Sequence, residues 1–190
     1  MKAPTYTGTC GKCGGALVTR TVPEYRNDAL MGIPGIVILN TVEEMRCRKC
    51  GHVAATGFSN LEGLIATVAV ARVAAARKLN ARDVRFLRKA LGWSSKELAA
   101  KLEVRDETVS RWENEREPMG PTSEKLLRLI VTQFLGDKAP ALDIDEKRIV
   151  SMRIRAVSTA TKPVEMRFRP VEMRVARRRE SAWEQVGEAA

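Results

Sequence analysis

The sequence lacks most of the features that mark secreted, membrane-spanning or catalytic proteins. It contains a single histidine and only 5% aromatic residues. The segment from Met1 to Thr9 has no apolar run of the kind that forms a signal peptide. The longest apolar stretch, from Leu64 to Ala76, is interrupted by Arg72 and is too short to span a bilayer. Because no apolar stretch can span a bilayer, we expect no membrane partner. Carboxylate pairs, histidine-based triads and phosphate-binding loops are also missing, so we expect no enzymatic activity.

Acidic residues are fewer than basic residues in this chain. It has 33 Lys and Arg residues against 23 Asp and Glu residues, which gives a formal net charge of +10. Such an excess usually indicates a polyanionic partner, most simply nucleic acid, although a basic surface that serves only solubility is the alternative. Part of the excess lies between Glu146 and Ala190, where basic residues outnumber acidic ones by 11 to 6.

All four cysteines lie in two Cys-x-x-Cys-Gly motifs, one ending at Gly14 and the other at Gly51. Two pairs of thiolates are the ligand set of a closed structural zinc site. The glycine after each pair permits the positive φ that such a turn often needs. We therefore predict one structural Zn²⁺ per chain, held by Cys10, Cys13, Cys47 and Cys50.

The cysteine pattern also bears on the compartment and on two alternatives. Paired cysteines without a signal peptide favour a reducing cytoplasm over a disulfide scaffold, so we expect a cytoplasmic protein. A redox-active Cys-x-x-Cys normally occurs once, at a helix N-terminus after a strand, and the sequence does not suggest that setting. The single histidine, His52, follows Cys50 closely but is expected to be an exposed loop residue rather than a ligand.

Short β-rich runs between glycines and prolines predict a small zinc-ribbon-like β domain over residues 1–58. Its expected strands are Ala16 to Val22, Gly35 to Val42 and Glu43 to Arg46. Beyond it, Leu61 to Lys78 carries apolar residues at helical spacing and is predicted to form a helix. Because small residues dominate this helix, it either links two domains or pairs with its copy in a dimer.

Three closely spaced helix starts predict a helix-turn-helix domain over residues 80–136. Asn80 and Ser94 each precede, by three positions, an acidic residue that can complete a capping box. Gly92 is expected to end the first helix of the domain. The turn before the third helix is expected at Glu103 to Arg105.

The pattern weakens after a fourth helix, which is predicted from Ser123 to Leu135 with Thr122 as its N-cap. A seven-residue segment that begins at Pro163 is then nearly repeated from Pro170, with apolar and charged residues alternating as in an edge strand. Pro170 cannot donate to a continuous ladder. We therefore expect residues 137–190 to form a basic, weakly structured extension that is ordered, if at all, by a partner.

The two cysteine motifs, followed by the string from Arg85 to Ala99 and by Thr108-Val-Ser-Arg-Trp-Glu-Asn114, resemble the MqsA/YgiT-type zinc-finger/helix-turn-helix proteins. The helix-turn-helix alone resembles the broad Xre/Cro group. The resemblance covers about residues 8–135. Together with the patterns above, it predicts an α+β protein with four parts: a zinc-binding domain (1–58), a linker or packing helix (59–79), an all-α Cro-like helix-turn-helix domain (80–136) and the extension (137–190).

The same resemblance implies a function. The chain would be a sequence-specific DNA-binding transcriptional repressor that binds a palindromic operator as a homodimer. It would also be the antitoxin of a type II toxin–antitoxin pair, with the N-terminal domain binding a small toxin protein. A stand-alone zinc-finger/helix-turn-helix regulator without a toxin is the alternative. We expect the dimer contact at Leu127 and Ile130, or along the helix at 61–78.

In Cro-like domains the third helix lies in the major groove. The resemblance therefore places Glu107, Thr108 and Arg111 at base edges, where a guanidinium can bond bidentately to guanine. Glu107 either accepts from cytosine or serves only the helix N-terminus. Ser95 is expected to contact phosphate. The full DNA-contact set expected from the sequence is Ser95, Arg105, Glu107, Thr108, Ser110, Arg111 and Asn114.

Other positions of the domain are expected to be structural or to depart from the family pattern. Arg88 is expected to pair with Glu113, and Trp112 is expected in the core. Glu103 stands where the turn of the family usually has glycine, and a left-handed conformation there costs about 1 kcal/mol. Glu115 stands where glycine usually ends the third helix. Arg105 stands where a Ser or Thr cap is usual, so Asp106 is the alternative cap.

Overall fold

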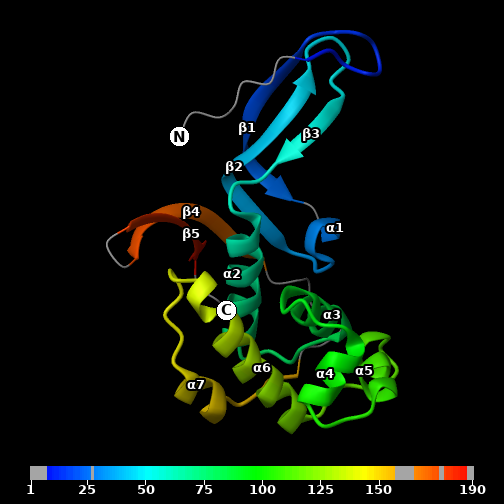
Figure 1. The fold of residues 1–190 in the computed structure, drawn as a ribbon, viewed down its shortest axis with the longest axis vertical. Coiled ribbons are helices and arrows are strands. Elements are labelled where there is room, and N and C mark those ends of the chain that lie inside the picture. The colour runs from blue at the N-terminus through cyan, green and yellow to red at the C-terminus, as the bar shows by residue number, and fades with distance from the viewer. Residues whose placement is uncertain (1–7, 27, 157–164, 176–177, 188–190) are drawn as a thin grey trace.

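The protein combines one mixed β-sheet with a layer of helices (Figure 1). The computed structural model describes residues 8–26, 28–156, 165–175 and 178–187. The strands are β1 (Leu17–Arg26), β2 (Ile36–Cys47), β3 (Val53–Gly57), β4 (Met166–Val175) and β5 (Arg178–Val186). The helices are α1 (Asp28–Met31), α2 (Leu61–Ala74), α3 (Ala81–Ala90), α4 (Ser95–Lys101), α5 (Asp106–Glu113), α6 (Pro121–Leu135), the 3₁₀ turn η1 (Gly136–Lys138) and α7 (Glu146–Ser151). The α+β class predicted from the sequence is confirmed.

Strand β2 is the centre of the sheet. Strand β1 pairs with it antiparallel along one edge, from Leu17 opposite Cys47 to Arg26 opposite Val37. Strands β3 and β4 share its other edge, β3 antiparallel and β4 parallel. The two strand segments expected before the second cysteine motif are therefore one continuous strand. Asn40 interrupts the alternation within β2 by adopting a φ of 53°.

The C-terminal part of the chain is built into this sheet, so the expectation of a weakly structured extension is wrong for its described strands. Strand β4 pairs with β2 from Met166 to Phe168, and β5 pairs antiparallel with β4. Phe168 and Trp183 are fully buried. Pro170 does not prevent this pairing, because the β2–β4 ladder ends before it. The start of the near-repeat, at Pro163, lies outside the described residues.

Helix α2 runs between the sheet and the other helices (Figure 1). Asn60 starts it in the left-handed conformation with φ 46°, and its side chain accepts a hydrogen bond from the Gly63 backbone N–H. A Cβ on Gly63 would lie only 2.5 Å from the Asn60 side chain, so glycine is needed there. Asn60 also donates to the Ser181 carbonyl and accepts from the Trp183 indole N–H, which fastens β5 to the start of the helix.

Helix α2 is buried on almost every side because the sheet, α3 and α6 all pack on it. Its one internal charge, Arg72, is 1% exposed and donates twice to Asp83 on α3, at 2.7 and 2.6 Å. The suggestion that this helix forms a dimer contact is therefore wrong, because its apolar residues are covered by the chain itself. The same holds for Leu127 on α6, which is 0% exposed, whereas Ile130 is half-buried.

The predicted capping boxes are confirmed at Asn80 and Ser94, where each side chain and its acidic partner exchange hydrogen bonds with the backbone. The prediction of Thr122 as the cap of α6 is wrong. Gly120 is the N-cap and Pro121 occupies the first helical position, where its missing N–H is no loss. Within the described residues, none of the helices is both long and apolar enough to cross a membrane.

Candidate nucleic-acid interface and metal centre

Helices α3, α4 and α5 are joined by two tight connections. Gly92 adopts a φ of 75° after α3, and the backbone N–H groups of Gly92 and Trp93 donate to carbonyls of the last helical turn. Glu103 adopts a φ of 52° after α4, as its place in the turn predicts. Here the Val104 N–H donates to the Ala99 carbonyl at 3.0 Å, which partly offsets the cost of a left-handed glutamate.

Helix α5 begins at Asp106 without a side-chain cap. Arg105 is the N-cap residue, and its side chain makes no capping hydrogen bond. The alternative that Asp106 caps the helix is therefore wrong, since Asp106 is already the first helical residue. Asp106 and Glu107 place two carboxylates in the first turn, where they complement the partial positive charge of the helix N-terminus.

One face of α5 packs into the domain and the other is exposed. Val109, Trp112 and Glu113 are buried, at 0%, 5% and 8% exposure, so the prediction of Trp112 as a core residue is confirmed. The predicted DNA-contact residues of this helix occupy the remaining surface. Arg105, Glu107, Ser110, Arg111 and Asn114 are exposed, and Thr108 is half-buried. Ser95, at the start of α4, is half-buried.

The exposed polar residues of α5 differ in how freely their side chains can move. Arg111 has only one ion pair among the described residues, with Glu117 at 3.8 Å, and both side chains are at least half exposed. Such an exposed pair contributes about 0–1 kcal/mol to the stability of the fold, so Arg111 can readily leave Glu117 for another partner. Asn114, in contrast, donates to the Ser110 carbonyl and accepts from Arg85, so it closes the end of α5. Sequence reasoning missed Arg85, whose guanidinium also donates to the Glu113 carbonyl at 2.7 Å.

The predicted Arg88–Glu113 pair is confirmed and joins α3 to α5. Arg88 donates from Nε and Nη2 to the two carboxylate oxygens of Glu113, at 2.6 and 2.9 Å. The side chains are 13% and 7% exposed. The hydrogen bond with Glu113 raises the pKa of Arg88 above its ordinary value, against the opposing effect of burial. This bidentate contact fixes the angle at which α5 is presented.

The four cysteines lie close together beside the start of β1 and the end of β2. Pairing of Leu17 with Cys47 brings the two motifs together. All four Sγ atoms lie within 4.8 Å of one another, with Cys13 Sγ 3.5 Å from Cys47 Sγ and 3.3 Å from Cys50 Sγ. A tetrahedral ion with metal–sulfur bonds of about 2.3 Å requires sulfur separations of about 3.8 Å. The cluster therefore fits one metal ion.

The turns around the cysteines have the geometry that the sequence predicts. Gly14 and Gly51 adopt φ values of 68° and 71°. Each donates its N–H to the carbonyl of the first cysteine of its motif. Gly15 is a further requirement that the sequence did not reveal, because a Cβ there would lie 3.0 Å from Cys47 Sγ. His52 is exposed and, within the described residues, is not part of the cluster.

Backbone N–H groups and neighbouring thiols give the cysteines of this cluster unequal pKa values. The backbone N–H of Cys50, followed by that of Lys49, lowers the pKa of Cys47 to about 6. For Cys13 the backbone N–H of Gly15 acts in the same direction, but the thiols of Cys50 and Cys47 outweigh it and raise its pKa to about 12. A metal ion bound among the four sulfur atoms would displace the thiol protons, because thiolate rather than thiol binds metal.

Residues 84–130 match the family model for helix-turn-helix domains. This segment is a helix-turn-helix domain. The match supports a DNA-binding transcriptional regulator. No curated protein and no solved structure matches the chain. The matched segment runs from within α3 to within α6, and the cysteine cluster lies outside it.

Replacing Glu113 with alanine is expected to destabilise the helix-turn-helix domain by about 3–5 kcal/mol, because it leaves the largely buried Arg88 without its counter-charge. Chemical denaturation followed by circular dichroism measures this change. Glu117→Ala is the matched control, since Glu117 is 50% exposed and should change the free energy of unfolding by less than about 1 kcal/mol. Equal unfolding free energies for the two variants would contradict the role assigned to the pair.

Proposed function

We propose that the protein is a sequence-specific DNA-binding repressor whose helix α5 reads the major groove. The observation that carries this proposal is the exposed polar face of α5 within a matched helix-turn-helix domain. Base edges are read by side chains that stand free of the protein core, and the exposed, weakly paired Arg111 meets that requirement best. The net charge of +10 favours approach to a polyanion.

The expected contacts divide by chemistry. Arg111 is assigned to guanine, and Thr108 and Glu107 to neighbouring base edges. Ser95 is assigned to a phosphate at the start of α4, where its hydroxyl can donate a hydrogen bond to a phosphate oxygen. Arg105 and Ser110 flank these positions. Asn114 remains in the proposed set, although its bonds to Ser110 and Arg85 give it more of a helix-ending role.

We further propose that the repressor acts as a homodimer through the outer face of α6. Leu126 and Phe134 are 40% and 56% exposed, and with the half-buried Ile130 they are spaced four residues apart, so they share one face. Phe134 also stacks edge-to-face on Trp93, with ring centroids 5.4 Å apart. A second copy is the fitting occupant, because helix-turn-helix readers bind two half-sites as two-fold dimers.

The metal is proposed to be Zn²⁺ in a structural role. Four thiolates in a closed set suit zinc and leave no open position for catalysis. The ion would be held by Cys10, Cys13, Cys47 and Cys50, and it would stabilise the end of the sheet that lies farthest from α2 (Figure 1).

Elemental analysis of protein purified without chelator is expected to find one zinc per chain. Cys13→Ser should abolish stoichiometric binding, because it removes one of the four sulfur ligands. His52→Ala is the control and should retain the metal, since His52 lies outside the cluster. A chain that contains no zinc, or a Cys13→Ser variant that keeps it, would refute the proposed centre.

More specifically, we propose that this repressor is the antitoxin of a type II toxin–antitoxin pair. This proposal rests on the resemblance to MqsA/YgiT-type proteins. In that case the N-terminal domain binds a small toxin protein and the chain represses its own operon. The competing proposal is a stand-alone regulator. Co-purification of the chain with a small protein encoded beside it distinguishes the two.

Arg111→Ala is expected to weaken binding to the DNA upstream of the protein's own gene by about 1–3 kcal/mol, because one bidentate base contact is lost. Binding to a scrambled duplex of the same length should change little. Fluorescence-anisotropy titrations at two salt concentrations measure both affinities.

The matched control is Arg20→Ala on β1, which removes the same charge outside the helix-turn-helix domain. Arg20 is largely exposed, so its loss should leave the preference for the upstream DNA intact. If Arg111→Ala instead lowers both affinities equally, the role of Arg111 is only electrostatic and α5 does not read bases as proposed.

A further inference from the structure

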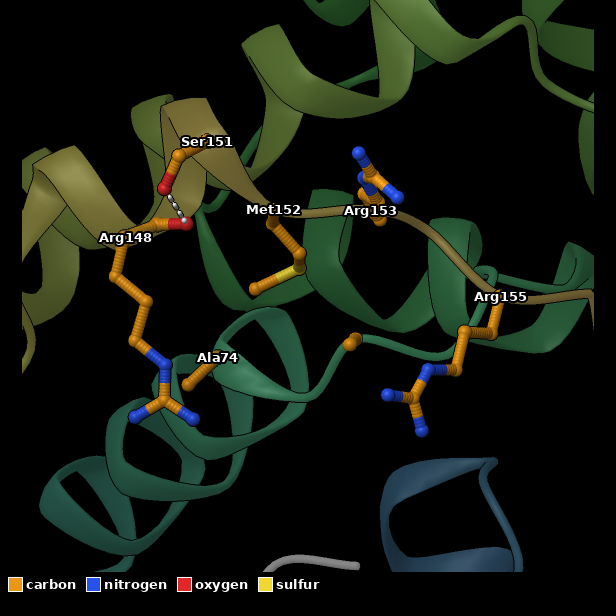
Figure 2. A pocket seen from close by; sticks show the side chains of 7 residues that line it. Ala74, Arg148, Ser151, Met152, Arg153 and Arg155 are labelled. Carbon is orange, nitrogen blue, oxygen red and sulfur yellow. Dashed lines mark hydrogen bonds between the residues drawn. The ribbon is translucent and has the colours of Figure 1, made fainter.

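A cavity of about 510 Å³ lies between the end of α2 and the segment that contains and follows α7 (Figure 2). Its apolar part is formed by Ala74, Ala76 and Met152. Three arginines line the same cavity, namely Arg148, Arg153 and Arg155. In Figure 2, Arg148 and Arg155 stand on opposite sides of Ala74 and Met152. A volume of this size is typical of small-molecule sites.

The cavity walls are held by backbone hydrogen bonds. The Arg155 N–H donates to the Ala76 carbonyl, and the Lys78 N–H donates to the Arg155 carbonyl, both at 2.8 Å. This short parallel pairing fixes the chain on either side of Arg155 against the end of α2. On the opposite wall, Lys125 of α6 donates to the Val150 carbonyl at 2.8 Å and holds the end of α7. Both walls are therefore tied to neighbouring elements by hydrogen bonds.

The arginines of the cavity differ from most other described arginines in having no counter-charge among the residues that the structure describes. Arg72, Arg88 and Arg128 each bond to a carboxylate. Within the described residues, no carboxylate lies within ion-pair distance of Arg148, Arg153 or Arg155; outside them the sequence contains one acidic side chain, Glu188. Three like charges around one small volume repel one another and attract an anion.

We propose that this cavity binds an organic phosphate, that is, a small molecule with a phosphate group and an apolar portion. Guanidinium groups bind phosphate oxygens bidentately, and a phosphate monoester carries close to two negative charges at neutral pH. The alanine and methionine surface receives the apolar portion. A duplex on α5 is a poor occupant, because α7 and α5 lie on opposite sides of the helical layer (Figure 1). This site does not depend on the function proposed above.

Phenyl phosphate is a suitable probe, because it joins a phosphate to one flat apolar ring. Isothermal titration calorimetry with the full-length, metal-loaded protein should give one site per chain. Arg148→Gln and Arg155→Gln should each weaken binding roughly tenfold, as expected for loss of one charge-assisted contact. Arg148→Lys, which keeps the charge but not the bidentate geometry, should fall between the wild-type protein and Arg148→Gln. Arg20→Gln is the control of equal charge loss and should bind like the wild-type protein.

Several outcomes would overturn the proposal. Equal weakening by Arg20→Gln would reduce the binding to general attraction by a basic protein. Inorganic phosphate that binds as tightly as phenyl phosphate would remove any role for the apolar surface. Displacement of phenyl phosphate by a non-operator duplex would assign the cavity to the DNA backbone. Arg148 and Arg155 are exposed, so their variants should fold, and circular dichroism confirms this before each titration.

Discussion

The guanidinium group of Arg128 on α6 caps the carboxyl-terminal end of α2 by donating to its unpaired carbonyl groups. This contact joins the helix that packs on the sheet to the helices of the helix-turn-helix domain. Arg128 donates at 2.6–2.7 Å to the carbonyl oxygens of Val73, Ala75 and Arg77. These carbonyls lie at or beyond the last helical turn, where a helix leaves its acceptors unpaired. Glu124 accepts from Arg128 and also from the Leu79 backbone N–H, so one fully buried ion pair satisfies several backbone groups. Burial lowers the pKa of Arg128, which still stays charged at neutral pH because an arginine starts far above it.

This contact makes α2 a shared element rather than a flexible link. Its first turn is fastened to β5 through Asn60, its middle to α3 through Arg72, and its end to α6 through Arg128. The chain after the helix-turn-helix domain then returns to the sheet, where β4 lies beside β2. The sheet that carries the cysteine cluster and the helices proposed to read DNA are consequently packed on one common helix.

The sequence predicts those parts of the fold whose signals are local. The cysteine motifs, the capping boxes at Asn80 and Ser94, and the Arg88–Glu113 pair depend on short spacings or on a known domain pattern. The pairing of β4 with β2 joins segments more than a hundred residues apart, and the sequence of neither segment indicates which strand it pairs with. The sequence favours Thr122 as a cap because it precedes an apolar run, but Pro121 already takes the first helical position. Periodicity on α6 identifies apolar residues without telling which face is covered, and Leu127 proves to be on the covered one.

The central proposal is that α5 reads DNA sequence from a two-fold dimer, and selection from a random pool tests it without any assumption about the operator. Full-length protein is incubated with random-sequence duplexes, and the bound fraction is amplified and sequenced over several rounds. We expect one enriched sequence with two inverted half-sites about 10 base pairs apart, centre to centre. The same selection with Arg111→Ala should lose the preference at one position of each half-site. A pool in which no sequence is enriched by the wild-type protein would contradict the proposal.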